Sequence, residues 1–205
     1  MNLKQITAVI LAGGRSSRMG ENKLLLPLGD KPVIGHLIET LNSLFVESIL
    51  VTDHAYAYQG FVVRTVADII RCPQKNSLTG IHAGLVAAGE DYCLVVAGDM
   101  PFINPSVLKY LANRCDGYDV TIIQDGAHYQ PLCAIYHKNC IPYMEKLLRQ
   151  NHYKILDFFP DVRVKYVDIA ELTKLDPEGM SFFNVNTPAE YQRAIDFYTK
   201  KTEEA

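Results

Sequence analysis

The chain has 205 residues, of which 48% are hydrophobic and 21% charged, and its formal net charge is −3. This balance is typical of a globular α/β protein with a well-filled core. Basic and acidic residues are mixed along the chain without a Lys/Arg block, so binding to nucleic acid or to a membrane surface is not predicted.

The compartment is predicted from the same composition. No apolar stretch is long enough to span a bilayer, and the first apolar run ends at two glycines without a signal-peptide cleavage pattern. The five cysteines form no C-x-x-C pair, which disfavours a disulfide framework and a structural zinc site. We therefore expect a cytoplasmic protein.

The first half of the chain alternates predicted strands and helices. Residues 5–12 form a continuous apolar run that ends at Gly13, which is typical of a buried strand. Apolar side chains then recur at helical spacing from Ile34 to Phe45, with Pro32 suited to the first turn. The next elements expected are strands at 48–52 and, at a sheet edge, 61–66, followed by a helix at 78–88 and a buried strand at 92–97.

The second half begins with a helix that Asn104 caps and Pro105 opens. Two β-like runs then flank Asp125-Gly126, a dipeptide that favours a hairpin. The remaining elements expected are the two hairpin runs themselves (118–124 and 129–136), a helix at 139–150, a strand at 162–168, and a final helix that starts at the capping box Thr187-Pro188-Ala189-Glu190.

This order of elements predicts the architecture. Strands that alternate with helices favour a three-layer, doubly wound α/β fold with a mostly parallel, Rossmann-like sheet and a small antiparallel hairpin excursion. No linker interrupts the pattern, so residues 1–205 are expected to form a single domain. Ligands of such folds bind beyond the carboxyl ends of the strands.

The segment LAGGRSSRMGENK, residues 11–23, directly follows the first predicted strand. Its backbone can approach a ligand closely at three glycines: Gly13, Gly14 and Gly20. Three cations accompany them: Arg15, Arg18 and Lys23. Together they predict a polyphosphate-binding loop, although the spacing matches neither the P-loop nor the dinucleotide G-x-G-x-x-G. A mobile basic loop is the alternative.

The segment VVAGDMP, residues 95–101, places Asp99 just past another buried strand. A carboxylate there lies at the same sheet edge as the first loop. A single carboxylate suffices for Mg²⁺, which takes most of its other ligands from water and phosphates. The alternative is that Asp99 only stabilises a turn.

Other polar and small residues give weaker signals. Asp68 follows a weak strand, and Gly80 and Gly84 lie four apart at a helix start, where either helix packing or a ligand explains them. Asn186 precedes the last helix and is expected to serve its turn, whereas Asn184 has no such local task. The six histidines form no metal-binding pair, and two of them are expected on ordinary helix faces: His36 and His82.

Taken in this order, LAGG with Lys23, VVAGDMP, QPLCAIY and FFNVNTPAEY resemble the molybdenum cofactor guanylyltransferases of the nucleotidyltransferase superfamily. The resemblance spans nearly the whole chain. It implies that Asp99 binds Mg²⁺ together with GTP and that Lys23 holds the phosphates. The nucleotide contacts implied are Leu11, Ala12, Gly13, Gly14, Lys23, Asp68 and Asp99. Gly80, at the predicted helix start, is added to them from its position alone.

The resemblance also implies the reaction, transfer of GMP from GTP to molybdopterin with release of pyrophosphate. Lys23, Asp99, Arg15 and Arg18 would be the catalytic groups. The N-terminal half would bind nucleotide and the C-terminal half the acceptor, with molybdoenzyme maturation proteins as further partners. The expected acceptor contacts are Gln130, Pro131, Asn184 and Asn186.

Two segments depart from the family pattern. The family usually has Gly-Pro-Leu-x-Gly where this chain has residues 76–80, and an asparagine after the second strand where this chain has Thr52-Asp53. The alternatives are therefore a cytidylyltransferase for the same cofactor, another small-molecule nucleotidyltransferase, or a nucleotide-binding module without turnover.

Overall fold

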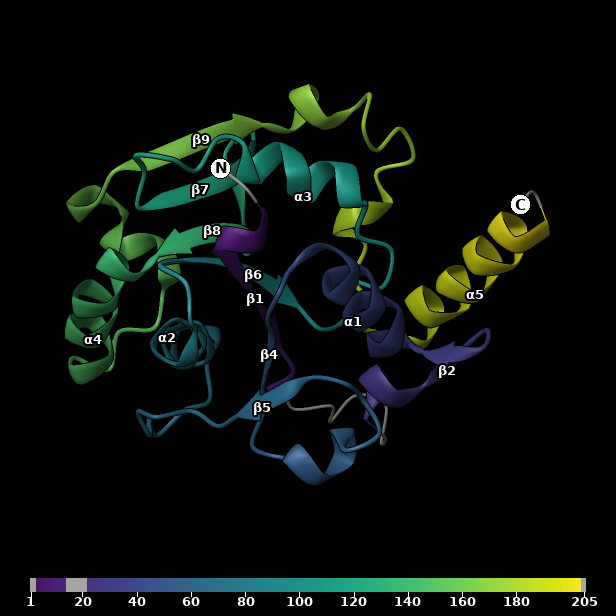
Figure 1. Cartoon of the computed structure of the whole chain (residues 1–205), viewed down its shortest axis with the longest axis horizontal. Helices are drawn as coiled ribbons and strands as arrows, with labels where there is room; N and C mark the ends of the chain where they lie inside the picture. The colour runs from purple at the N-terminus through teal and green to yellow at the C-terminus, as the bar shows by residue number, and fades with distance from the viewer. Residues whose placement is uncertain (1–2, 14–21, 204–205) are drawn as a thin grey trace.

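The computed structural model describes residues 3–13 and 22–203. In this part of the chain a seven-stranded sheet has the order β5-β4-β1-β6-β8-β7-β9 (Figure 1). In chain order its strands are β1 (Ile6–Leu11), β4 (Ser48–Val51), β5 (Arg64–Val66), β6 (Tyr92–Ala97), β7 (Val120–Asp125), β8 (His128–His137) and β9 (Val164–Asp168).

The sheet is parallel except at β8, which runs antiparallel to both β6 and β7. Val95 of β6 pairs with Val9 of β1 on one side and with Ala134 of β8 on the other. The expected hairpin is present and turns at Gly126, whose φ of 55° is in the left-handed region. Both of its strands, β7 and β8, belong to the main sheet, so the hairpin is part of the sheet and not a separate excursion from it.

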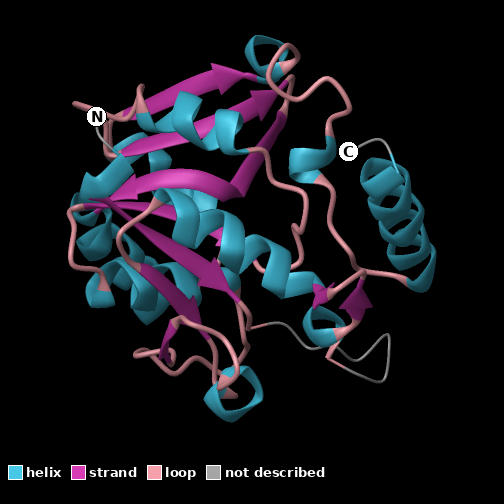
Figure 2. Ribbon diagram, turned by 45° about the vertical axis from the view of Figure 1, so that its right-hand side comes forward, coloured by secondary structure: helices cyan, strands magenta, loops and turns pink. Residues whose placement is uncertain are grey.

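Helices cover both faces of the sheet, as expected for a doubly wound fold (Figures 1 and 2). The helices are α1 (Val33–Leu44), α2 (Ser77–Ala87), α3 (Pro105–Ala112), α4 (Ile141–Arg149) and α5 (Pro188–Glu203). The side chains of β1 alternate between the two faces, with Ile10 in the core beneath α1 and α3 and Val9 in the core beneath α2 and α4.

The helix α2 packs unusually close to the sheet. A Cβ atom at Gly84 would lie only 2.2 Å from Cγ1 of the fully buried Val9. Close approach of the helix therefore requires a residue without a side chain at this position.

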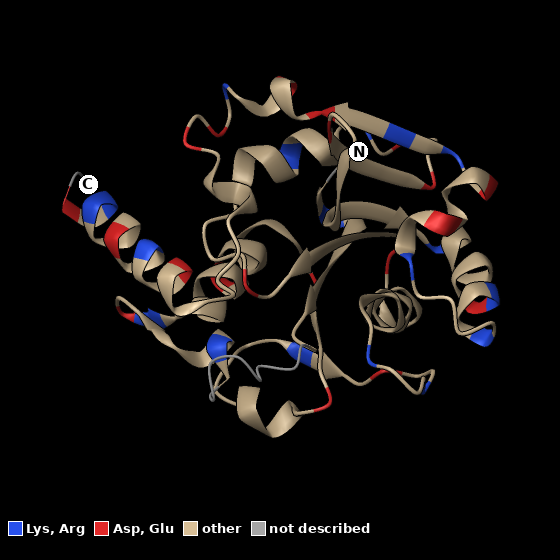
Figure 3. Cartoon of the chain, turned by 180° about the vertical axis from the view of Figure 1, so that it is seen from behind, with Lys and Arg blue, Asp and Glu red and all other residues tan. Residues whose placement is uncertain are grey.

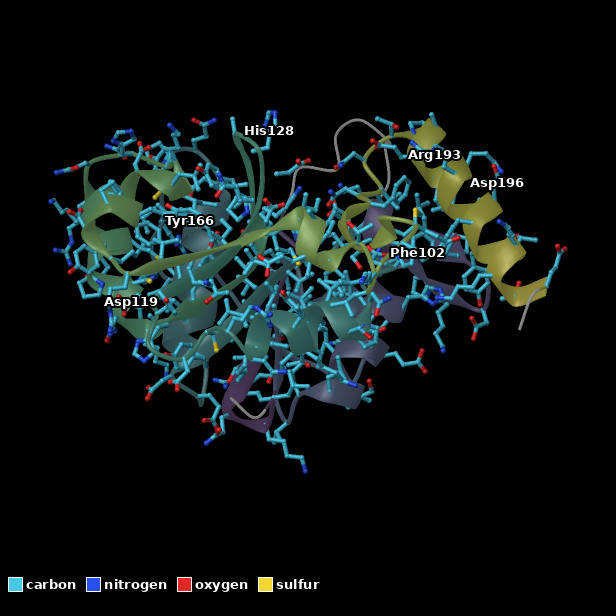
Figure 4. The ribbon with its side chains drawn as sticks, turned by 90° about the horizontal axis from the view of Figure 1, so that it is seen from above. Phe102, Asp119, His128, Tyr166, Arg193 and Asp196 are labelled. Carbon is cyan, nitrogen blue, oxygen red and sulfur yellow. The ribbon has the colours of Figure 1, made fainter. Side chains whose placement is uncertain are left out.

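The last helix, α5, lies at one side of the molecule against a two-stranded sheet formed by β2 (Pro27–Leu28) and β3 (Lys31–Pro32). Its capping box is confirmed, since Thr187 Oγ1 accepts from the Glu190 amide at 3.2 Å and Glu190 Oε2 accepts from the Thr187 amide at 2.8 Å. Phe102 packs against this helix, and its ring centroid lies 4.7 Å from that of Phe197 on α5. Arg193 and Asp196 of the same helix are labelled with Phe102 in Figure 4. Acidic and basic residues alternate along this helix (Figure 3).

Two expectations differ from the structure. The edge strand begins at Arg64 rather than residue 61, because the backbone of residues 61–63 turns, with the Phe61 amide bonded to Tyr58 O at 3.1 Å. His82 is not on an ordinary helix face: it is 2% exposed, and its Nε2 lies 3.4 Å from Oε1 of Glu145 on α4.

Short 3-10 helices connect the main elements. They span Leu3–Gln5, Lys23–Leu25, Ala55–Tyr58, Lys138–Cys140, Ile155–Asp161, Ile169–Leu172 and Met180–Phe182. Within the described ranges, none of the helices is long and apolar enough to cross a membrane.

Candidate active site

A cleft of about 300 Å³ opens at the carboxyl edge of β1, β4 and β6, where the sequence predicts a ligand. Most of the predicted site residues line it: Leu11, Ala12, Gly13, Lys23, Asp68, Gly80, Asp99, Asn184 and Asn186. Three further members of the predicted site, Gly14, Arg15 and Arg18, lie outside the described residues.

Lys23 lines this cleft together with Asp99. It begins a short 3-10 helix that Asn22 caps by accepting from the Leu24 amide at 3.3 Å. Its Nζ donates to Asp99 Oδ2 and to Asn186 Oδ1, both at 2.6 Å. The lysine and Asp99 side chains are 18% and 15% exposed, so this ion pair is largely shielded from water. The fold therefore brings together a cation and a carboxylate that lie 76 residues apart in the sequence.

Asp99 is held in place by its backbone. The Gly98 amide donates to Leu11 O at 2.9 Å, and Asp99 O accepts from the Val185 amide at 2.9 Å. A Cβ at Gly98 would lie 3.0 Å from Leu11 O, so this junction between β6 and β1 favours glycine. The ends of β1 and β6 are thus joined by a hydrogen bond at the residue that precedes Asp99.

The second carboxylate oxygen of Asp99 suits a metal ion. Oδ1 is buried and has no hydrogen-bond partner among the residues that the structure describes. A buried oxygen without a partner is costly unless a ligand satisfies it. The same part of the chain holds no group of three or more His, Cys, Asp or Glu side chains that could form a metal cage. An oxygen of this kind could serve as one ligand of a metal ion whose other ligands come from water or from a bound molecule.

The other end of the cleft lies around Asp68 and the start of α2. Thr79 Oγ1 donates to Asp68 Oδ2 at 3.1 Å. Burial raises the pKa of the Asp68 carboxyl above its ordinary value, against the lowering effect of this hydrogen bond. Asn76 caps α2 by accepting from the Thr79 amide at 3.0 Å. The weak sequence signals at Asp68 and Gly80 thus converge on one wall of the cleft.

Two charged residues of this wall were not among the predicted site residues. Lys75 Nζ lies 2.7 Å from Asp53 Oδ2, and both residues line the cleft. The rule that identified Asp99 could have found Asp53, because it too is an acidic residue just past the carboxyl end of a strand. Lys75 lies in an irregular loop before α2 and gives no comparable signal.

The two asparagines differ in part from the local roles expected of them. Asn184 does serve its own segment, since its Nδ2 donates to Phe182 O at 3.0 Å. The side chain of Asn186 instead reaches Lys23, and only its backbone amide serves the helix start, donating to Glu190 Oε2 at 2.9 Å. The expected role of Asn186 at the turn is thus confirmed for its backbone, whereas its side-chain contact with Lys23, 163 residues away, was not predicted because it leaves no local pattern in the sequence.

The predicted acceptor residues Gln130 and Pro131 lie near the start of β8 and are partly exposed. They do not line the cleft, although Leu132 of the same strand does. Because β8 runs antiparallel to β6, its first residues lie at the sheet edge where β6 ends. Gln130 and Pro131 therefore lie at the same edge of the sheet as the cleft but do not form part of its lining.

Comparison with known proteins agrees with this geometry. A family model described as "MobA-like NTP transferase domain" matches residues 8–163. A relative from Pelotomaculum thermopropionicum, named probable molybdenum cofactor guanylyltransferase, is 43% identical over 93% of this chain and 92% of its own length. A relative from Desulfosudis oleivorans, named molybdenum cofactor guanylyltransferase, is 31% identical over 92% of this chain and 94% of its own.

The fold is shared with a solved structure as well. The crystal structure of molybdopterin-guanine dinucleotide biosynthesis protein A from Archaeoglobus fulgidus superposes with a TM-score of 0.82 at 30% identity, covering 95% of this chain and all of the other. Sequence, fold and cleft thus lead to one conclusion: the chain belongs to the MobA-like NTP transferase family and is a nucleotidyltransferase.

Proposed function

We propose that this nucleotidyltransferase transfers GMP from GTP to molybdopterin, forming molybdopterin guanine dinucleotide and releasing pyrophosphate. The names of its relatives support these substrates, since the chain is 43% identical to a probable molybdenum cofactor guanylyltransferase over nearly its whole length. The observation that carries the proposal is the Lys23–Asp99 pair at 2.6 Å, which stands in the cleft beyond β1 and β6.

The nucleotide would lie across the carboxyl edge of the sheet. Its triphosphate would occupy the end with Lys23, Asp99 and the backbone of Gly13, joined by Arg15 and Arg18 of the glycine-rich loop. Its base and ribose would occupy the end with Asp68 and Gly80. In this orientation the positive groups meet the phosphates, and the apolar side chain of Leu11, which lies beside Gly80, is left for the base.

The metal in this proposal is Mg²⁺, which Asp99 would hold through Oδ1, the carboxylate oxygen without a hydrogen-bond partner among the described residues. Such an ion supplies positive charge that neutralises the phosphates and stabilises the charge that develops in the transition state. Asp99 Oδ2 meanwhile keeps its bond to Lys23, so one carboxylate positions two positive centres at once.

The chemistry is an in-line displacement at the α-phosphorus of GTP. A terminal phosphate oxygen of molybdopterin forms the new bond to phosphorus, and the bond to the oxygen bridging the α- and β-phosphates breaks, so that pyrophosphate leaves. The attacking phosphate is already anionic at neutral pH, and no general base is needed. Lys23 would reduce the repulsion between the two anions, and Asn186 would hold the lysine in place.

The acceptor would approach from the side of the cleft that the second half of the chain supplies. Asn184 and Asn186 line the cleft there, and Gln130 and Pro131 lie at the nearby start of β8. This division assigns nucleotide binding to the N-terminal half and acceptor binding to the C-terminal half of a single domain.

The test is a direct assay of the purified chain with molybdopterin, Mg²⁺ and each of GTP, CTP, ATP and UTP. We expect pyrophosphate and the guanine dinucleotide, measured by a coupled assay and by mass spectrometry, with GTP as the preferred donor. A preference for CTP would identify a cytidylyltransferase. No pyrophosphate with any nucleotide would contradict the proposed reaction and favour a nucleotide-binding module.

A further inference from the structure

Lys23 is held by its backbone as well as by its side chain. Its ammonium group is bonded within the cleft, and its backbone directly follows Asn22, whose side-chain amide is used at both ends. Asn22 Oδ1 accepts from the Leu24 amide at 3.3 Å, and Asn22 Nδ2 donates to the hydroxyl oxygen of Tyr58 at 3.0 Å. A planar amide that is bonded at both ends cannot rotate without losing one of these bonds.

The tyrosine that receives this bond is firmly packed. Tyr58 ends the 3-10 helix that begins at Ala55, and it is only 2% exposed. It belongs to the same buried core as Leu24, and the Phe61 amide donates to its carbonyl oxygen at 3.1 Å. Burial raises the pKa of the Tyr58 hydroxyl, so the group is neutral at neutral pH. A side chain packed in this way offers Asn22 a fixed acceptor.

The short helix that begins at Lys23 depends on contacts of this kind. It spans Lys23–Leu25, and the Leu25 amide donates to Asn22 O at 2.9 Å. A helix of three residues has little stability of its own, because its few hydrogen bonds do not offset the cost of ordering the backbone. Tyr58 lies 36 positions after Asn22, in the connection between β4 and β5, so this bond joins the helix to a separate part of the fold.

We propose that Tyr58 is a positioning residue for the nucleotidyl transfer: through Asn22 it fixes the start of the short helix and so places the ammonium group of Lys23. This inference rests on the role proposed for Lys23 in the reaction. Tyr58 is not among the residues that line the cleft, so it acts through Asn22 and not on the substrate. The effect on the rate follows because a group that stabilises the transition state loses much of its benefit when it is displaced by about 1 Å.

The first test is Tyr58→Phe, which removes the hydroxyl group and keeps the buried ring. The turnover number should fall about threefold to tenfold, the scale of one lost hydrogen bond between neutral groups. It is measured as the initial rate of pyrophosphate release at saturating GTP and acceptor. Tyr56→Phe is the matched control, because it makes the same change in the same 3-10 helix at a side chain that is 84% exposed. Its turnover number should equal that of the wild type.

A double-mutant cycle separates positioning from a general effect on the fold. Lys23→Ala has no ammonium group to position, so adding Tyr58→Phe to it should lower the turnover number by less than about twofold. A purely structural role of Tyr58 would lower the turnover number by the same factor with and without the lysine. Thermal unfolding of each variant shows that the rates compare folded proteins.

Hydrogen exchange followed by NMR tests the link to Asn22 without any assay of activity. Tyr58→Phe should speed exchange of the Leu24 and Leu25 amides, which bond to Asn22. The Ala57 amide, which bonds within the turn that leads to Tyr58, should exchange as in the wild type. Faster exchange at Ala57 as well would show that the substitution loosens its own segment, which would contradict the proposal.

The outcomes distinguish this inference from the proposed function. An impaired Lys23→Ala together with a Tyr58→Phe enzyme as fast as the wild type would overturn the role of Tyr58 alone. Equal losses from Tyr58→Phe in the presence and absence of Lys23 would likewise assign the hydroxyl to stability only. A Lys23→Ala enzyme as fast as the wild type, or a wild type that releases no pyrophosphate, would overturn the proposed mechanism and this inference with it.

Discussion

Lys23 is the residue on which the two halves of the site meet, because its ammonium group binds Asp99 from the first half and Asn186 from the end of the chain. Replacing Lys23 with Ala should lower the turnover number about 10²-fold or more, since it removes one preorganised positive group from the transition state. The measurement is the initial rate of pyrophosphate release at saturating GTP and acceptor.

The control for this variant is Lys31→Ala, which removes an exposed lysine that pairs with Glu39 on α1 outside the cleft. Its turnover should match that of the wild type, because exposed ion pairs contribute little. A Lys23→Ala enzyme as fast as the control would refute the role proposed for Lys23.

Asp99 is expected to act through Oδ1, which has no hydrogen-bond partner in the described part of the chain. In Asp99→Asn the side chain keeps its shape but loses the charge that attracts Mg²⁺. The Mg²⁺ concentration needed for half-maximal rate should rise by at least about tenfold, the scale seen on weakening a metal site. A titration of rate against Mg²⁺ measures this, with Asp116→Asn, exposed at a turn away from the cleft, as the control. An unchanged Mg²⁺ dependence would exclude Asp99 as the ligand.

At the residue level, the sequence predicts contacts between residues that directly follow the carboxyl ends of neighbouring strands. Lys23 and Asp99 could be placed together because both follow strands whose carboxyl ends share an edge. The partner of Asn186 could not be predicted, since it depends on how the chain returns over 163 residues. The pairing of Asp53 with Lys75 was missed for a related reason: the loop that carries Lys75 has no periodic pattern that would fix its path.

At the level of elements, Gly84 shows how closely α2 lies against β1. Gly84→Ala should lower the free energy of unfolding by about 1–3 kcal/mol, because the new Cβ would lie 2.2 Å from a methyl group of Val9 that has no space to move. The roughly 1 kcal/mol that Ala gains over Gly in a helix offsets part of this loss. Thermal unfolding would show a decrease of about 2–4 °C for each kcal/mol lost.

Gly80→Ala, one turn earlier in the same helix, is the matched comparison. Its Cβ would lie 3.2 Å from the flexible end of Leu11, which can shift, so stability should change little. Because Gly80 lines the cleft, the substitution should instead weaken nucleotide binding. Equal losses of stability in the two variants would contradict this assignment of one glycine to packing and the other to the ligand.

The elements themselves were largely predictable, because their signals are local. Apolar runs and helical spacing located β1, β6, α1 and α2 to within a few residues, and Asp125-Gly126 located the turn of the hairpin. The place of β8 between β6 and β7 was not predictable from these signals. Strand order depends on contacts between distant segments, and a turn dipeptide specifies a reversal without specifying which other strand will pair.

At the level of the whole molecule, ligand binding should be visible as added stability. A nucleotide at 100 times its dissociation constant stabilises the folded state by about 2.7 kcal/mol. We expect GTP with Mg²⁺ to raise the midpoint of thermal unfolding more than CTP, ATP or UTP do, and expect the effect to shrink when Mg²⁺ is removed with EDTA. Equal shifts for all four nucleotides would argue against selection of guanine by the free protein.

The hydrogen bond between Lys23 and Asn186 has a consequence for how the protein folds during its synthesis. A chain emerging from the ribosome displays its glycine-rich loop and Lys23 first, and domains begin to fold during synthesis. The lysine cannot reach Asn186 until the 163 positions that separate them have been synthesised. Lys23 is therefore fully restrained only after every strand of the main sheet has been made, and a product cut short before Asn186 could complete the sheet while its lysine lacked one of its two anchors.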